Sequence, residues 1–149
     1  MLTIILLSFL GAVLAIIIGT VWYMPFTPMG RVHMQYLGFD KLSKEEQDKK
    51  IEEAKPHMRK SYLGQTLLSF LTSFFVVFMM TKSLENGESF KMVTMYLVMT
   101  WACFMVPVIG SNLIWGNCDR AIVWKKFFYD IMSNLVTILV IVGVTSLFL

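Results

Sequence analysis

FFYDIMSNLVTILVIVGVTSLFL, residues 127–149, is the stretch of sequence that decides the fold. It contains one acidic residue, Asp130, and no basic residue. As an α-helix it would be about 34 Å long, which exceeds the about 30 Å hydrocarbon core of a bilayer. No other part of the chain is large enough to bury such a helix in a soluble core. The stretch therefore predicts a membrane-spanning helix.

The polar residues of this stretch fall on one side of the predicted helix. Asp130, Ser133, Asn134 and Thr137 are spaced at i, i+3, i+4 and i+7, which places them on a single face. A polar stripe on an apolar helix needs protein or water opposite it rather than lipid. We therefore expect other helices of the chain to cover this face.

The composition indicates an integral membrane protein. The chain has 149 residues, of which 56% are hydrophobic and 15% charged, and its mean hydropathy is +0.66. Soluble domains typically contain about 25% charged residues. Because the charges are clustered, the net charge of +3 is evidence about orientation in a bilayer and not about nucleic-acid binding.

The apolar segments predict an all-α integral membrane protein, an antiparallel four-helix transmembrane bundle in a single domain, 1–149. The expected spans are 2–22, 61–81, 92–115 and 127–149, joined by a loop at 23–60 and turns at 82–91 and 116–126. In the loop, the capping-box spacing of Ser43 and Glu46 predicts one short solvated helix, which we expect to end before Pro56. The first span lacks the basic start of a signal peptide, so we expect it to be retained.

Small residues suggest where the helices touch. Gly11, Ala15 and Gly19 repeat the small-xxx-small spacing that lets two helices approach closely. Pro107 should kink the third span and free a backbone carbonyl.

Lysine and arginine predict the orientation. Of the 13 such residues in the chain, all but Lys82 and Lys91 lie in 23–60 or 116–126. The positive-inside rule places these two segments in the cytoplasm and both termini outside it. The predicted location is the cytoplasmic (inner) membrane, with the lipid bilayer, and either further copies or another membrane protein, as partners.

This orientation gathers polar residues near the cytoplasmic end of the bundle. The candidate binding cluster consists of Tyr23, Gln65, Asn112, Asp130 and Asn134. Asp130 allows two interpretations. It could pair with Lys126 at i−4 near the membrane interface, or it could face inward as a functional carboxylate.

The cysteines and histidines predict no metal or cofactor site. Cys103 and Cys118 form no Cys-x-x-Cys motif, and His33 and His57 lack carboxylate or cysteine partners at ligand spacing. No Ser-His-Asp arrangement or phosphate-binding glycine loop occurs, so we expect no enzymatic activity.

Several motifs together resemble a known family. They are Gly19-Thr-Val-Trp22-Tyr23-Met-Pro25 at the end of the first span, a third span with aromatic, proline and asparagine positions, and a basic turn before a span with an early Asp. The third-span positions are Trp101, Phe104, Pro107 and Asn112. The chain resembles the bacterial membrane proteins grouped as domain of unknown function 1761, differing at His33, where Trp is usual, and at Cys103, where Gly is usual. The resemblance implies a four-helix membrane domain of unassigned activity.

Three classes of function remain open. A structural or accessory membrane protein, self-associating or serving a larger complex, agrees best with the small-residue packing and the lack of a continuous polar path. The alternative is a small solute or ion transporter or channel that uses Asp130. An enzyme acting at the membrane surface is the third class.

Overall fold

The computed structural model describes residues 1–114 and 119–149, and every regular element in this part of the chain is helical. The predicted all-α class is confirmed. The elements are α1 (Leu2–Trp22), α2 (Pro28–Tyr36), the 3₁₀ turn η1 (Phe39–Lys41), α3 (Lys44–Glu85), α4 (Phe90–Thr100), the π-helical turn η2 (Trp101–Met105), α5 (Val106–Ile114) and α6 (Arg120–Ser146).

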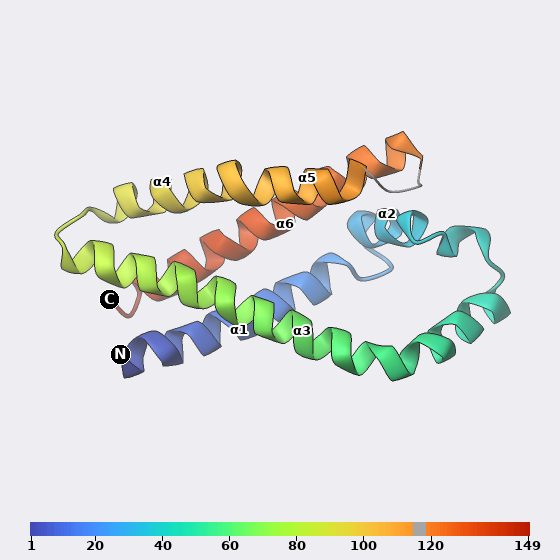
Figure 1. The fold of residues 1–149 in the computed structure, drawn as a ribbon, viewed down its shortest axis with the longest axis horizontal. Helices are drawn as coiled ribbons and strands as arrows, with labels where there is room; N and C mark the ends of the chain where they lie inside the picture. The colour runs from blue at the N-terminus through green and yellow to red at the C-terminus, as the bar shows by residue number, and fades with distance from the viewer. Residues whose placement is uncertain (115–118) are drawn as a thin grey trace.

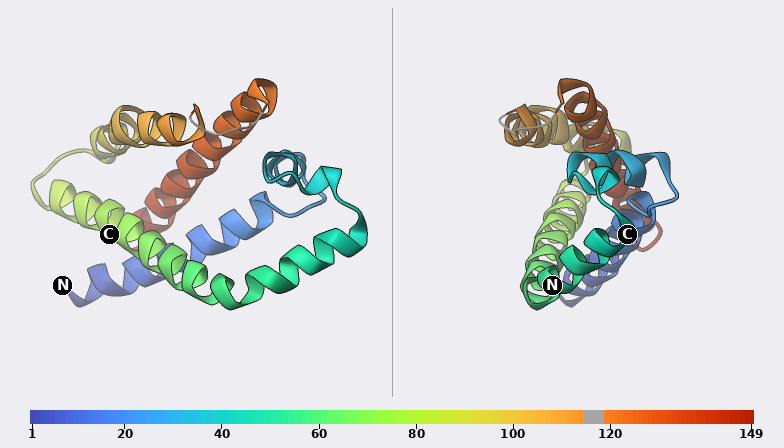
Figure 2. Two further views of the ribbon diagram at one scale, coloured as in Figure 1. Left: turned by 45° about the vertical axis from the view of Figure 1, so that its right-hand side comes forward. Right: turned by 90° about the vertical axis from the view of Figure 1, so that its right-hand side faces the viewer.

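The long helices run side by side in alternating directions (Figure 1). Both termini and the α3–α4 connection lie at one end of the molecule. At the other end lie α2, the end of α5 and the starts of α3 and α6, and we call this the α2 end (Figures 1 and 2). Within the described residues, four helices are long and apolar enough to cross a membrane, namely Leu2–Trp22, Lys44–Glu85, Phe90–Leu113 and Arg120–Ser146.

The first helix has the predicted bounds, but the other three begin earlier than predicted, α4 by two residues and α3 and α6 by more. The predicted turn at 116–126 is wrong from Arg120 onward, because α6 already begins there. Asp119 is its N-cap, and the carboxylate accepts a hydrogen bond from the backbone N–H of Ala121 at 2.8 Å. A helix can therefore start in polar sequence well before its apolar run.

The predicted short helix before Pro56 and the separate span at 61–81 form one helix, α3, of 42 residues. Its predicted capping box is confirmed, since Ser43 and Glu46 bond each other's backbone N–H groups. The predicted end at Pro56 is wrong. Proline removes one helical hydrogen bond, and the residues around it are exposed, so water can satisfy the freed carbonyl. The helix bends in this polar part and continues (Figure 1).

Helix α2 was not predicted from the sequence. Thr27 caps it, accepting a hydrogen bond from the N–H of Gly30 at 2.9 Å, and Pro28 occupies its first turn. Gly30 packs directly on the carbonyls of Tyr23 and Met24, where no larger residue would fit. The chain thus folds back immediately after α1 and lays α2 against α6.

The third apolar helix changes its hydrogen bonding before Pro107. Proline cannot donate a hydrogen bond to the carbonyl four residues earlier. The turn Trp101–Met105 widens, and the N–H of Val106 bonds to the carbonyl of Trp101. The irregularity expected at Pro107 is therefore present as a π-helical turn. A turn between α3 and α4 is also found, with Gly87 at φ +83, but it is shorter than the predicted 82–91, because α3 continues to Glu85 and α4 begins at Phe90.

The apolar core lies toward the end of the molecule that carries the termini. It is formed by residues from α1, α3, α4 and α6, namely Ile4, Leu7, Val76, Val77, Met80, Val93, Leu97, Ile138, Ile141 and Val142. Of the small-residue stripe, Gly11 is the tight contact, since a Cβ there would overlap Ser73 Oγ and lie 3.2 Å from Ile141 Cγ2. Ala15 is half-buried, and a Cβ at Gly19 would meet open space. The stripe is therefore not a continuous contact, because α1 and α3 cross rather than run parallel (Figure 2).

Candidate functional site

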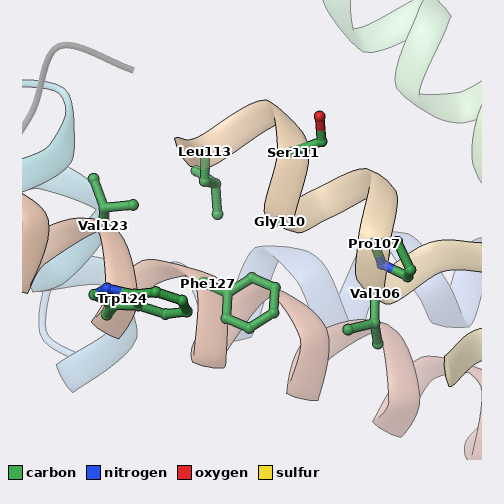
Figure 3. A pocket seen from close by; sticks show the side chains of 8 residues that line it. All are labelled: Val106, Pro107, Gly110, Ser111, Leu113, Val123, Trp124 and Phe127. Atoms are coloured by element: carbon green, nitrogen blue, oxygen red, sulfur yellow. The ribbon is translucent and has the colours of Figure 1, made fainter. Parts of the chain in front are cut away.

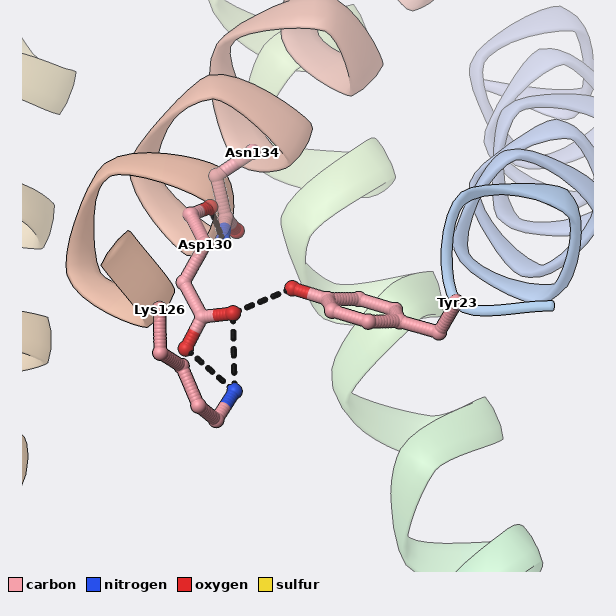
Figure 4. Close-up of polar contacts among 4 residues, drawn as sticks. All are labelled: Tyr23, Lys126, Asp130 and Asn134. Carbon is pink, nitrogen blue, oxygen red and sulfur yellow. Dashed lines mark hydrogen bonds and ion pairs between the residues drawn. The ribbon is translucent and has the colours of Figure 1, made fainter. Parts of the chain in front are cut away.

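A cluster of polar and aromatic side chains joins α1, α2 and α6 toward the α2 end. Lys126 Nζ lies 2.8 Å from Asp130 Oδ1 and 2.7 Å from Asp130 Oδ2, and the hydroxyl of Tyr23 donates a hydrogen bond to Asp130 Oδ1 (Figure 4). The side chains of Lys126 and Asp130 are only 11% and 17% exposed. The ion pair of the first interpretation is therefore present, and protein covers most of both side chains.

Local helix geometry explains this arrangement. Residues four apart on α6 lie one above the other, which brings Lys126 onto Asp130. Tyr23 directly follows α1, so its ring reaches across to α6 from the adjacent helix end (Figure 4). The ammonium of Lys126 also lies 5.4 Å from the ring centroids of Tyr23 and Tyr36. Two carboxylate oxygens and two aromatic faces thus surround one buried positive charge.

His33 extends the cluster onto α2. Its ring centroid lies 5.2 Å from that of Tyr23, and its Nδ1 is buried without a hydrogen-bond partner in the described part of the chain. Burial, and then the nearby charge of Lys126, lower the pKa of His33, while Asp130 acts in the opposite direction. Burial, and then its hydrogen bond to Asp130 and the charge of that residue, raise the pKa of Tyr23. At neutral pH His33 is therefore uncharged and Tyr23 keeps its proton.

The structure brings together part of the predicted cluster. Tyr23 and Asp130 are in direct contact, and Asn134 donates to the backbone carbonyl of Asp130 at 2.8 Å. Gln65 is exposed and donates to Ser69 Oγ at 3.4 Å, and Asn112 is exposed on α5. These last two residues lie at the protein surface and not in the cluster.

Sequence reasoning missed His33 and Tyr36 as members of the cluster, and it did not predict that Lys126 is buried. The first two lie on α2, and the signal that could have revealed this helix is the Thr27-Pro28 pair, an N-cap followed by a first-turn proline. In the described residues, no three His, Cys, Asp or Glu side chains gather closely enough to hold a metal ion. Cys103 is a free, exposed thiol, whereas Cys118 and Trp115 lie outside the described residues.

The family described as Protein of unknown function (DUF1761) matches residues 6–146. The chain belongs to this family. The matched range runs from α1 into α6 and includes every residue of the cluster, and it confirms the resemblance found in the sequence motifs. No curated protein and no solved structure matches the chain. The description of the DUF1761 family assigns no activity, so a function has to be argued from the geometry.

Proposed function

We propose that the protein is inserted in the cytoplasmic membrane as an antiparallel four-helix bundle, with the α2 end in the cytoplasm and both termini outside. Four helices of sufficient length and apolarity support this proposal. The orientation is supported by the Lys and Arg residues, since all but Lys82 and Lys91 belong to segments at or near the α2 end.

Within the membrane, the proposed function is structural or accessory and not enzymatic. The observation that supports a structural function is that the oxygens of Asp130 already have partners within the cluster. Both oxygens of Asp130 are occupied by Lys126, and Tyr23 donates to one of them. A carboxylate that binds a transported ion must offer its oxygens to that ion, whereas here both oxygens bond Lys126 and one of them also links α6 to Tyr23 at the end of α1. Toward the other end, the interior is filled by apolar residues such as Val77 and Met80, both 0% exposed.

Self-association is the second part of the proposal, and we assign it to the α4–α5 helix. Only 11% of the apolar window of Phe90–Leu113 is buried, against 28%, 28% and 22% for the other three helices. The exposed surface of this helix includes Cys103 and Asn112. An asparagine on a membrane helix is better satisfied by another protein helix than by lipid. A second copy of the chain, packed on α4–α5, would supply that helix.

The native thiol of Cys103 allows a direct test. In a Cys118→Ser protein, oxidative crosslinking in isolated membranes should yield a covalent dimer through Cys103. The matched control replaces both native cysteines and carries Val13→Cys on α1, a similarly apolar and exposed position. A dimer through Cys103 and none through position 13 is the expected result. Monomer in both variants, together with a monomeric size in mild detergent, would contradict self-association.

Transport is the second candidate, and one observation favours it. The buried, unpartnered Nδ1 of His33 stands beside the Lys126–Asp130 pair, so a proton could be exchanged there. Purified protein in liposomes should nevertheless show the same proton and cation flux as the folded Asp130→Asn variant. A flux that the wild type carries and this variant loses would favour a transporter over a structural protein.

A further inference from the structure

A hollow of about 220 Å³ lies between α5 and α6 toward the α2 end. Pro107, Gly110 and Leu113 line it from α5, and Val123, Trp124 and Phe127 line it from α6 (Figure 3). A Cβ at Gly110 would lie 3.2 Å from the ring of Phe127, so this glycine lets the aromatic ring pack close to α5. The hydroxyl of Ser111, at the rim, points away from the two aromatic rings (Figure 3).

The size and chemistry of the hollow suit a hydrocarbon chain. A dry apolar cavity of about 150 Å³ is enough to bind benzene, so this hollow has room for several methylene groups. It is open to the outside, because Trp124 is 60% exposed and Pro107 is exposed as well. In a bilayer, a side opening of this kind faces lipid.

Basic residues stand where the headgroup of such a lipid would be. Arg120 precedes Val123, Trp124 and Phe127 by three, four and seven residues, so it lies on the same face of α6, one turn nearer the α2 end. Both Arg120 and Lys125 are exposed. A guanidinium group binds phosphate through paired hydrogen bonds, and the indole of a tryptophan is typical of the headgroup region. The neighbouring carboxylate of Asp119 is engaged in capping α6.

We propose that this hollow is a binding site for an anionic phospholipid of the cytoplasmic leaflet. One acyl chain lies between α5 and α6, and the phosphate of the headgroup lies against Arg120. The inference rests on the membrane insertion proposed above. The first turns of α6 would then bind a lipid as well as enter the bilayer, since Arg120 and the residues that line the hollow follow one another along one face of this helix.

Photocrosslinking from lipid to protein tests the proposal. The full chain is reconstituted in phosphatidylcholine vesicles with a trace of phosphatidylglycerol, or of phosphatidylcholine, carrying a diazirine on one acyl chain. Peptide mapping should find phosphatidylglycerol label concentrated on Pro107–Leu113 and Val123–Phe127, about fivefold above the phosphatidylcholine label, as one basic residue near the surface provides. Arg120→Gln should abolish this headgroup preference, whereas Lys91→Gln, at the opposite end, should leave it unchanged.

A second variant tests the hollow itself. Gly110→Leu fills the space between the helices and should reduce the label there several-fold, while Val108→Leu, on the exposed surface of α5, should not. Circular dichroism shows whether both variants remain folded. If Gly110→Leu does not fold, the headgroup preference and its loss in Arg120→Gln decide the matter.

Three outcomes would overturn the inference. Label spread evenly over the exposed apolar residues of α1 and α5, without headgroup preference, would mean ordinary solvation by lipid. Capture of a second protein copy by a photoreactive residue placed at position 124 would mean that a helix fills the hollow. Absence of label from the whole chain would mean that the protein is not inserted, and would contradict the proposed function as well.

Discussion

Removing one partner of the buried Lys126–Asp130 pair should destabilise the protein more than any surface charge does. In Lys126→Met, the carboxylate of Asp130 keeps the Tyr23 hydroxyl but loses its counter-charge in a site where it is 17% exposed. Breaking a buried ion pair from one side costs about 3–5 kcal/mol in general. We expect about 3 kcal/mol here, the lower end of that range, because the Tyr23 hydroxyl still donates to the carboxylate. Asp130→Leu should cost a similar amount, since it leaves the Lys126 ammonium unpaired.

The double variant Lys126→Met/Asp130→Leu separates the ion pair from simple loss of packing. With both charges gone, the Tyr23 hydroxyl loses the acceptor to which it donates, at a cost of about 1–3 kcal/mol. Two independent losses would instead add to about 6 kcal/mol. Gln65 and Asn112 should not be affected, because both are exposed and the partners of Asp130 are Tyr23 and Lys126.

Equilibrium unfolding in mixed micelles, with a denaturing detergent as the variable, measures these free energies. Lys125→Met is the matched control, because Lys125 is the exposed neighbour of Lys126. Equal free energies of unfolding for Lys125→Met and Lys126→Met would refute the reasoning. So would a double variant as unstable as the sum of the two single ones.

Three further predictions concern orientation, packing and pH. In a background without native cysteines, a cysteine at Ser43 should resist a membrane-impermeant thiol reagent in intact cells and one at Asn86 should react, and the opposite pattern would reverse the proposed orientation. Gly11→Ala should lower the free energy of unfolding by about 1–3 kcal/mol through overpacking, whereas Gly19→Ala, in open space, should be neutral or slightly stabilising; equal effects would show that α1 and α3 do not meet as described. Because the pKa of His33 is below its ordinary 6.5 in the folded protein, the unfolded chain binds a proton that the folded chain does not, so stability should fall as pH drops below about 6.5. His33→Gln should flatten that pH dependence in unfolding curves, and an unchanged slope would remove His33 as its source.

The helices were predictable to the extent that apolar length defines them. For α1 the apolar run and the helix coincide, since Trp22 and the following prolines end both. Helices α3 and α6 begin before their apolar runs, because Ser43 and Asp119 cap polar helical turns that precede those runs. An apolar segment predicts which residues can lie in lipid, and a capping residue predicts where a helix begins. The two coincide only when a helix ends at the membrane surface.

The cluster shows a second limit of the same kind. The sequence and the orientation rule together assign a depth to each polar residue, and Tyr23 and Asp130 do lie at one level. They do not assign the direction in which a side chain points around the bundle axis, which depends on how the helices are rotated against each other. Gln65 and Asn112 were expected in the cluster by depth, and they point outward. Lys126 was expected near the membrane interface because of its charge. It points inward, where the ring of Tyr36 on α2 covers its ammonium group. A buried ion pair can therefore be foreseen from sequence only once the element that covers it has been recognised, and here that element begins with a threonine and a proline.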